Sequence, residues 1–448
     1  MRVLFWIGMR KNEIDIVLLG CSKNLIDAER LMHRLESAGF HCVCDSAHPR
    51  GEIAVINTCG FIGDAKEESI NAILAFAERK RQGKLRRLYV MGCLSERYLK
   101  ELEGELPEVD KFFGKFDFMG IVDELQKEKG ETVSGERCSQ RDFERHLTTP
   151  QHYAYLKIAE GCNRFCSYCA IPLITGRYKS RDMEEIVEEV RWLAAKGVRE
   201  LQVIAQDLTA YGTDLYGESR IGELISRISD VEEIRWIRLH YAYPTHFPMD
   251  LLRVMRERKN VCNYLDIALQ HSTDRMLDLM RRHITASEQT ALIEKIREQV
   301  PGIHLRTTLM VGHPGETEQD FEEMVEWVKR MRFERMGAFA YSEEEGTYAA
   351  EHYKDDIPNE EKERRLERLM AVQEDIAAEI NSNKVGKQLQ VVVDREEGDY
   401  YVGRTEYDSP EVDGEVLIKK EENCRVGEFY EVEIVKADTF DLYGKITK

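Results

Sequence analysis

The stretch Ala159–Arg181, AEGCNRFCSYCAIPLITGRYKSR, places three cysteines within eight residues of the chain. They are Cys162, Cys166 and Cys169, with the spacing C-x3-C-x2-C. Three thiolates from one loop suit three corners of an iron–sulfur cube and leave the fourth iron without a protein ligand. A small molecule can chelate such an open iron, whereas a purely electron-carrying cluster normally has cysteine on every iron. The spacing therefore favours a [4Fe–4S] cluster that binds a small molecule.

Two other interpretations of this cysteine loop remain open. Zinc knuckles usually combine C-x2-C with a second pair, or with histidines, about a dozen or more residues further on. Here the next histidine is His240, and no second close pair of cysteines follows. The third interpretation is three buried, unpaired thiols, although free cysteines are usually scattered through a core.

Size and charge limit the class of protein. The 448 residues are enough for two or three domains, and 33% charged with 42% apolar residues indicates a soluble, globular chain. The formal net charge of -19 disfavours non-specific binding to nucleic acid and favours binding to a basic partner. Eleven cysteines and no secretory signal indicate a reducing compartment where thiols serve as metal ligands.

The amino terminus, MRVLFWIGMRK, contains an apolar run that is too short for a membrane span or a convincing signal sequence. We therefore expect a cytoplasmic protein with no membrane association. One interpretation is that residues 1–8 are a non-native extension and that Met9 is the working start.

The first part of the chain alternates between strand and helix patterns. Strands are predicted at 14–20, 52–57 and 88–91, and helices follow each of them, over 64–79 and from about Ser95 in the second and third units. Such alternation predicts a parallel sheet in an α/β domain, which we place at 12–130. The apolar positions that define the first helix are Leu25, Ala28, Leu31, Met32 and Leu35.

Each of these three strand-to-helix turns carries a cysteine: Cys21, Cys59 and Cys93. Because ligands gather at the carboxyl ends of parallel strands, three thiolates presented there could hold a second cluster with one open iron. The alternative is that small cysteines beside glycines simply fit tight turns. Cys42 and Cys44 are interpreted as ordinary strand residues, and no function is assigned to Cys138, Cys262 or Cys424.

The central part, placed at 145–382, repeats a strand–helix period six times. Six units suit a partial (β/α) barrel with its site at the carboxyl ends of the strands. Those ends carry polar groups and glycines that suit a bound ligand, chiefly Gln206, Asp207, Gln270 and Gly312. His271 and His283 are interpreted as packing or surface residues. The predicted strands are 153–160, 200–206, 235–241, 264–269, 304–311 and 335–341, with helices at 183–196 and 317–331 among the connections.

After a long helix over 359–381, the chain becomes β-rich. Strands predicted at 389–394, 400–404, 415–418, 430–437 and 439–446 indicate a small antiparallel barrel at 383–448. Small barrels often bind nucleic acid, but residues 384–448 carry ten Lys and Arg against sixteen Asp and Glu. This charge suits a basic protein ligand better than phosphate, and the alternative is a module whose charge only confers solubility.

The cysteine loop, with Tyr168 before the third cysteine, resembles the signature of the radical S-adenosylmethionine (radical SAM) enzymes. The whole chain from about Asn12 resembles the methylthiotransferase family, which joins a three-cysteine domain, a radical SAM barrel and a carboxyl-terminal TRAM barrel. Its motifs LGCSKNLIDAE, EGCNRFCSYCAIPLITGRYKSR, AQDLTAYG and LQHSTDRMLDLMRR look like the RimO branch. That branch methylthiolates the β-carbon of an aspartate in ribosomal protein uS12.

The resemblance implies a role for each matching residue. Cys162, Cys166 and Cys169 would hold the catalytic [4Fe–4S] cluster that cleaves S-adenosylmethionine, and Cys21, Cys59 and Cys93 an auxiliary [4Fe–4S] cluster that presents sulfur. Two molecules of S-adenosylmethionine would be used per turnover, one for methylation and one for the radical. The expected cofactor contacts are Tyr168, Gln206, Gln270 and Gly312.

The implied partners are uS12, free or on the small ribosomal subunit, and an electron donor such as flavodoxin or ferredoxin. One departure from the family is His313, which stands where phenylalanine is frequent. Two competing functions remain open: a tRNA methylthiotransferase of the MiaB type, and a two-cluster electron carrier without transferase activity.

Overall fold

The computed structural model describes residues 9–128 and 143–447, which separate into two compact units. The first unit contains the described residues up to Thr148 together with 170–177, and the second contains 149–169 and the residues from Tyr178 onward. The interpretation of residues 1–8 as an extension, and the lack of an assigned role for Cys138, fall outside the described residues.

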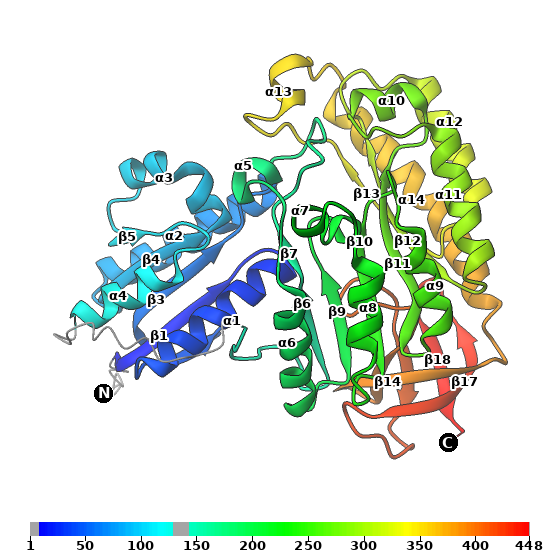
Figure 1. Cartoon of the computed structure of the whole chain (residues 1–448). Helices are drawn as coiled ribbons and strands as arrows, with labels where there is room; N and C mark the ends of the chain where they lie inside the picture. Colours follow the sequence, from blue (N-terminus) through cyan, green and yellow to red (C-terminus); the bar gives the residue numbers. More distant parts are fainter. Residues whose placement is uncertain (1–8, 129–142, 448) are drawn as a thin grey trace, which may run out of the picture. The chain divides into compact units, whose positions relative to one another are not determined.

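The first unit is built on a five-stranded parallel sheet with the strand order β2-β1-β3-β4-β5 (Figure 1, blue to cyan). The predicted parallel α/β domain is thereby confirmed. Its elements are β1 (Arg10–Leu18), α1 (Ser22–Ser37), β2 (His41–Cys44), β3 (Gly51–Thr58), α2 (Gly63–Arg81), β4 (Arg87–Gly92), α3 (Cys93–Glu105), β5 (Lys111–Phe112), α4 (Phe118–Glu128) and the short α5 (Ile171–Thr175).

Side chains that alternate along the central strand bury both faces of this sheet. Val55 packs with apolar residues of α1 and α4, whereas Ala54 and Ile56 pack with α2 and α3. The apolar stripe of α1 differs slightly from the predicted one, because Ile26 is fully buried while Leu25, one position earlier on the helix, is only half-buried. Cys42 and Cys44 lie in β2, as expected of strand residues.

The second unit begins with a six-stranded parallel sheet in the order β13-β12-β11-β10-β9-β6, which is the predicted partial barrel. Its elements are β6 (Tyr153–Lys157), β7 (Ala159–Glu160), β8 (Lys179–Ser180), α6 (Met183–Ala195), β9 (Glu200–Ile204), the 3-10 turn η1 (Leu208–Ala210), α7 (Thr213–Tyr216), α8 (Ile221–Ser229), β10 (Trp236–Ala242), α9 (Met249–Glu257), β11 (Val261–Gln270), α10 (Asp274–Leu279), α11 (Ala286–Gln299), β12 (His304–Val311), α12 (Glu318–Met331), β13 (Arg335–Ala340), α13 (Tyr348–His352) and α14 (Asn359–Ser382).

The first strand of the partial barrel is shorter than the predicted 153–160. It ends at Lys157, and Ala159–Glu160 forms the separate strand β7, which pairs antiparallel with β8. Ile158 between them donates its amide to Ile204 and accepts the amide of Arg181. The chain therefore leaves the sheet at this point and enters the cysteine loop.

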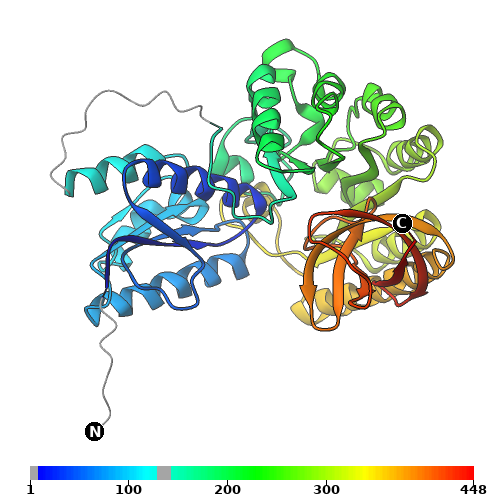
Figure 2. The same cartoon turned by 90° about the horizontal axis from the view of Figure 1, so that it is seen from below.

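The carboxyl-terminal strands close into a barrel, as predicted (Figure 2, orange to red). Four of its neighbouring pairs are antiparallel, and β16 and β18 pair in parallel. The last strand starts later than the predicted Thr439, because the amide of Asp438 donates to Asp441 in a turn before it. The strands are β14 (Gln388–Glu397), β15 (Tyr400–Thr405), β16 (Val416–Lys419), β17 (Phe429–Ala437) and β18 (Leu442–Ile446).

Buried ion pairs join this small barrel to the amino-terminal ends of the parallel strands. Arg404 of β15 donates to Glu200 at the start of β9 (2.8 Å), and Arg238 of β10 donates to the same carboxylate (3.0 Å). Further along, Arg335 at the start of β13 donates to Asp408, with Nε 3.1 Å from Oδ1. The carboxyl-terminal barrel thus covers the end of the sheet opposite to the cysteine loop.

No helix within 9–128 or 143–447 combines the length and apolar character needed to cross a membrane.

Candidate functional site

The cysteine loop of the second unit is fixed by its own backbone. Its three sulfurs differ in exposure, with Cys162 and Cys166 buried and Cys169 half-buried. The amide of Ser167 donates to the carbonyl of Met280 (3.1 Å), and its carbonyl accepts the amide of Ala349 (2.7 Å). The loop is therefore attached to the end of α10 and to the first turn of α13, which holds the thiols in place.

The thiols of Cys162 and Cys166 meet hydrogen-bond donors. The amide of Arg164 lies 3.5 Å from Cys162 Sγ, and the guanidinium of Arg282 lies 3.2 Å from Cys166 Sγ. The hydroxyl of Tyr243 is 3.6 Å from the same Cys166 sulfur. Burial raises the pKa of Cys162 to about 11, so this free thiol is protonated at neutral pH. A metal that binds here must therefore displace a proton.

Arg164 connects the cysteine loop to the end of β9. Its Nε donates to Asp207 Oδ2 at 2.6 Å, and its guanidinium carbon lies 4.2 Å from the centre of the Tyr243 ring. The other Asp207 oxygen caps the following turn by accepting the amide of Thr209 (3.0 Å). Both oxygens of Asp207 therefore have protein partners, and this residue positions the loop.

His313, the residue that departs from the family pattern, also contacts the cysteine loop. Its Nε2 lies 3.1 Å from the Ser167 hydroxyl, and its Nδ1 lies 3.0 Å from the carbonyl of Pro314. Its ring packs edge-on against Tyr168 and is fully buried. Burial lowers the pKa of His313 to about 4, so it is neutral at pH 7. The structure gives His313 a positioning role in the loop.

Three of the predicted cofactor contacts, Gln206, Gln270 and Gly312, lie at strand ends, and the fourth, Tyr168, lies in the cysteine loop. Gln206 follows β9 and is half-buried. Gln270 ends β11 with a φ of 72° and is 7% exposed, and its Oε1 has no hydrogen-bond partner among the described residues. The half-buried Tyr168 accepts a hydrogen bond from Arg282 (3.3 Å). The amide of Gly312 donates to Glu316 (2.7 Å), so it is already used within the protein.

Glu316 faces inward rather than capping a helix. Its carboxylate accepts from Arg365 at 2.8 Å, and burial raises its pKa to about 7. The helix α12 is instead capped by Thr317, which forms a capping box with Asp320.

In the first unit, the three separated cysteines come from turns that pack directly on one another. A side chain at Gly20, which has a φ of 93°, would place its Cβ 2.9 Å from the Cβ of Cys59. A Cβ at Gly60 would come within 2.8 Å of the Cys93 backbone. Glycine is therefore required at both places, because a side chain at Gly20 would collide with the side chain of Cys59 and a side chain at Gly60 would collide with the backbone of Cys93.

Asn24 contacts all three of these turns and is 2% exposed. Its Nδ2 donates to the carbonyls of Leu19 (3.2 Å) and Thr58 (3.0 Å), which precede Cys21 and Cys59. Its Oδ1 accepts from Cys93 Sγ at 3.4 Å. Sequence reasoning missed Asn24, because an asparagine in the first turn of a helix is also common as an ordinary polar residue.

The buried thiols of this set are protonated when no metal is bound. Burial raises the pKa of Cys93 to about 12 and that of Cys59 above its usual value. Cys21 is exposed. The surroundings of Cys93 are apolar, with Ala170 and Ile174 packed against it.

Both sets of three cysteines suit an iron–sulfur cube by their donor chemistry. In the described parts of the chain, no three His, Cys, Asp or Glu side chains are arranged about a single metal ion. A cube, however, gives each thiolate its own iron, so its ligands do not converge on one point. Three soft thiol donors on a backbone-fixed loop fit such a group.

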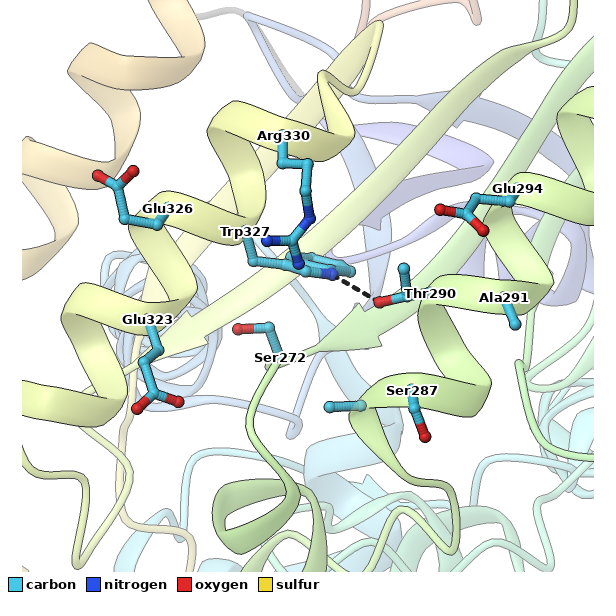
Figure 3. A pocket seen from close by; sticks show the side chains of 10 residues that line it. Ser272, Ser287, Thr290, Ala291, Glu294, Glu323, Glu326, Trp327 and Arg330 are labelled. Carbon is cyan, nitrogen blue, oxygen red and sulfur yellow. Dashed lines mark hydrogen bonds between the residues drawn. The ribbon is translucent and has the colours of Figure 1, made fainter.

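A separate pocket of about 520 Å³ lies between α11 and α12 (Figure 3). Trp327 closes one side and donates to the hydroxyl of Thr290 (2.9 Å). The pocket is lined by Ser272, Ala286, Ser287, Thr290, Ala291, Glu294, Glu323, Glu326, Trp327 and Arg330. It contains none of the predicted site residues.

Three family models match the chain in succession. Residues 13–114 match uncharacterized protein family UPF0004, residues 156–328 match the radical SAM superfamily, and residues 385–447 match the TRAM domain. Radical SAM proteins bind a [4Fe–4S] cluster and S-adenosylmethionine.

Solved structures resemble the fold at low sequence identity. The radical S-adenosylmethionine methyltransferase TsrM from Kitasatospora setae, bound to tryptophan and a SAM analogue, aligns with a TM-score of 0.56 and 12% identity over 86% of this chain and 79% of its own. The cobalamin-dependent radical enzyme OxsB, with aqua-cobalamin and S-adenosylmethionine bound, aligns with a TM-score of 0.52 and 11% identity over 83% of this chain and 56% of its own.

Curated relatives are similar over almost the whole chain. The ribosomal protein uS12 methylthiotransferase RimO of Bacteroides thetaiotaomicron is 62% identical over 98% of this chain and 99% of its own. The proteins of the same name from Porphyromonas gingivalis and Cytophaga hutchinsonii are 57% and 48% identical over 98% of this chain. The chain therefore belongs to the RimO family of radical SAM methylthiotransferases and is a transferase.

Proposed function

We propose that this protein transfers a methylthio group to the β-carbon of an aspartate in ribosomal protein uS12. The observation that carries the proposal is the 62% identity to a uS12 methylthiotransferase over 98% of the chain. The matched 98% of the chain leaves room for no more than a few unmatched residues, so it spans both regions that carry the cysteine sets and the carboxyl-terminal barrel.

In this proposal the two cysteine sets have different roles. Cys162, Cys166 and Cys169 would hold the cluster that binds S-adenosylmethionine, and Cys21, Cys59 and Cys93 would hold an auxiliary cluster. When bound, the two clusters and two molecules of S-adenosylmethionine supply the radical that removes hydrogen from carbon and the methylthio group that replaces it. A C–H bond without an activated proton cannot be broken by a general base near neutral pH, which is why such a cofactor is needed.

The residues of the chain bind and orient the cofactor and keep water away from it. Gln270 offers a buried Oε1 at the end of β11 that has no partner in the part of the chain that the structure describes, and this atom suits an amino or hydroxyl donor of the cofactor. We propose Gln206, Tyr168 and Gly312 as further cofactor contacts. Because the Gly312 amide donates to Glu316, the contact at Gly312 would be made by its carbonyl. At the opposite end of the sheet, Glu200 and Arg238 are fully buried beneath the carboxyl-terminal barrel and are shielded from water.

The charge of the carboxyl-terminal barrel favours a protein substrate over tRNA. Its excess of six acidic residues would repel the phosphates of the MiaB-type substrate and attract a basic ribosomal protein. A ribosomal substrate also supports a cytoplasmic location. Because reductive cleavage of S-adenosylmethionine consumes an electron, we also propose a separate low-potential electron donor such as flavodoxin or ferredoxin. We propose three domains, at 12–130, 145–382 and 383–448.

The substrate is tested by mass spectrometry of uS12 purified from a strain that lacks this protein. We expect uS12 from the deletion strain to be lighter than the wild-type protein by one methylthio substitution, and complementation to restore the mass. An unchanged uS12 mass would rule out the proposed substrate. Loss of a methylthio group from tRNA in the same strain would favour the MiaB-type alternative.

Substitution of Asn24 tests the auxiliary site without changing a cysteine. In Asn24→Ala, the turns that carry Cys21, Cys59 and Cys93 lose their common hydrogen-bond partner. Iron bound by anaerobically reconstituted protein should fall from about eight to about four atoms per chain, because one of two cubes is lost. Production of 5′-deoxyadenosine, which depends on the other cysteine set, should continue.

The matched control is Asn260→Ala in the second unit. Asn260 also bridges two carbonyls with its Nδ2, those of Ser229 (3.0 Å) and Ile234 (3.1 Å). It should lose some stability but keep the full iron content. Equal iron loss in both variants would show that Asn24 has only a general role in folding.

A further inference from the structure

Arg282 lies beside the cysteine loop of the second unit and is 2% exposed. Its Nη1 is 3.2 Å from Cys166 Sγ and 3.3 Å from the Tyr168 hydroxyl, and its Nη2 donates to the carbonyl of Ala268. The guanidinium carbon lies 4.1 Å from the centre of the Tyr243 ring. These contacts fix the planar group against one particular sulfur.

This buried cation has no carboxylate partner within the part of the chain that the structure describes. The other deeply buried arginines of the second unit do have one: Arg238 and Arg404 share Glu200, and Arg335 pairs with Asp408. A buried charge is costly unless an opposite charge compensates it. The nearest group that can become an anion is the Cys166 thiol, which is ionised when it binds iron.

We propose that Arg282 is a positioning residue that pairs with the ionised Cys166 sulfur and raises the reduction potential of the cluster on Cys162, Cys166 and Cys169. The inference rests on one part of the proposed function, the assignment of a [4Fe–4S] cluster to these cysteines, and it does not depend on the substrate. It concerns a one-electron step, in which a low-potential electron donor is oxidised and the cluster gains the electron.

The direction of the effect follows from electrostatics. Reduction adds a negative charge to the cluster, and a fixed positive charge beside one of its sulfurs stabilises the reduced form more than the oxidised form. Hydrogen bonds to cluster sulfurs act in the same direction and are among the main determinants of cluster potentials. Arg282 supplies both the charge and an N–H donor.

The test is an anaerobic redox titration of the reconstituted full-length protein, followed by electron paramagnetic resonance of the cluster. The first variant is Arg282→Gln, made in a Cys21→Ala background so that one cluster is observed. We expect at least a tenfold smaller equilibrium constant for reduction, equivalent to a potential about 59 mV more negative. Arg282→Lys keeps the charge but loses the planar fork, so we expect a smaller shift in the same direction.

The matched control is the adjacent Arg281→Gln, because the Arg281 guanidinium lies over the ring of Tyr348, 4.4 Å from its centre. Its potential should equal that of the parent protein. If Arg282→Gln does not take up iron, Arg282→Lys decides the question. An unchanged potential in an iron-loaded Arg282 variant would overturn the inference.

This result is independent of the substrate. If the Arg282 variants shift the potential but the parent protein leaves uS12 unmodified, the role of Arg282 is supported and the proposed substrate is ruled out. If the parent protein modifies uS12 but the Arg282 variants leave the potential unchanged, the proposed function stands and the role of Arg282 is ruled out.

Discussion

Replacing Cys21 with alanine is expected to abolish methylthio transfer while S-adenosylmethionine is still cleaved. Cys21 is exposed at the start of α1, so its loss removes little packing, unlike that of the buried Cys59 or Cys93. Its role would be that of a direct ligand, and removal of even an outer-shell partner of a metal typically costs about 10–100-fold. We therefore expect a loss of transfer greater than about 100-fold.

The measurement compares two products of the same reduced, reconstituted protein. Liquid chromatography with mass detection follows 5′-deoxyadenosine and the methylthiolated uS12 peptide together. The matched control is Cys44→Ala, because Cys44 is half-buried in β2 and has no proposed role. Methylthiolated peptide formed by Cys21→Ala at the control rate would contradict the auxiliary role. Absence of 5′-deoxyadenosine from every variant and from the parent would favour the electron-carrier alternative.

The fold and the positions of the cysteines within it could be predicted from the sequence, because the sequence patterns that indicate them are local or repetitive. Strand–helix alternation indicated both parallel sheets, and glycine–cysteine turns at successive strand ends indicated that Cys21, Cys59 and Cys93 lie at one edge. The close packing of those turns agrees with that expectation. Ligation of iron by the six cysteines stays a prediction.

The residues that position these cysteines could not be predicted, because their partners are distant in sequence. Arg282 follows Cys166 by 116 residues, and His313 follows Ser167 by 146. An arginine or a histidine in a polar loop gives no sign that it is buried. The roles of Asp207 and Glu316 could not be predicted either, since a carboxylate after a strand can bind a ligand or pair with an arginine of the same protein equally well.

The contact between the carboxyl-terminal barrel and the parallel sheet could not be predicted from the sequence either. It is the basis of the second prediction, which concerns stability. Glu200→Gln is expected to lower the free energy of unfolding of the second unit by about 3–5 kcal/mol, the usual result of removing one partner from a buried ion pair. Arg404 would keep Asp394 as a partner (2.6 Å). Arg238 would keep backbone carbonyls, two aromatic rings and a neutral amide, but no carboxylate among the described residues. Both arginines would remain buried.

The pH dependence of this interaction has a definite sign. Burial alone would raise the pKa of Glu200, but the charges of Arg404 and Arg238 outweigh it and hold the pKa below its usual value. The stabilisation is therefore complete above the unfolded pKa of about 4.3 and is lost as the pH falls through the lower folded value. The difference in stability between the parent protein and Glu200→Gln should shrink in acid.

Urea denaturation followed by tryptophan fluorescence measures this effect, because Trp236 packs edge-on against Phe429 of the barrel, with ring centres 4.8 Å apart. The control is Glu184→Gln, which removes an exposed pair with Arg227 and should change stability little. If Glu200→Gln unfolds no more readily than this control, the charges contribute no net stability. The barrel would then be held by the apolar contacts of Trp236, Val392 and Phe429, and Glu200 would serve only to compensate the two arginines.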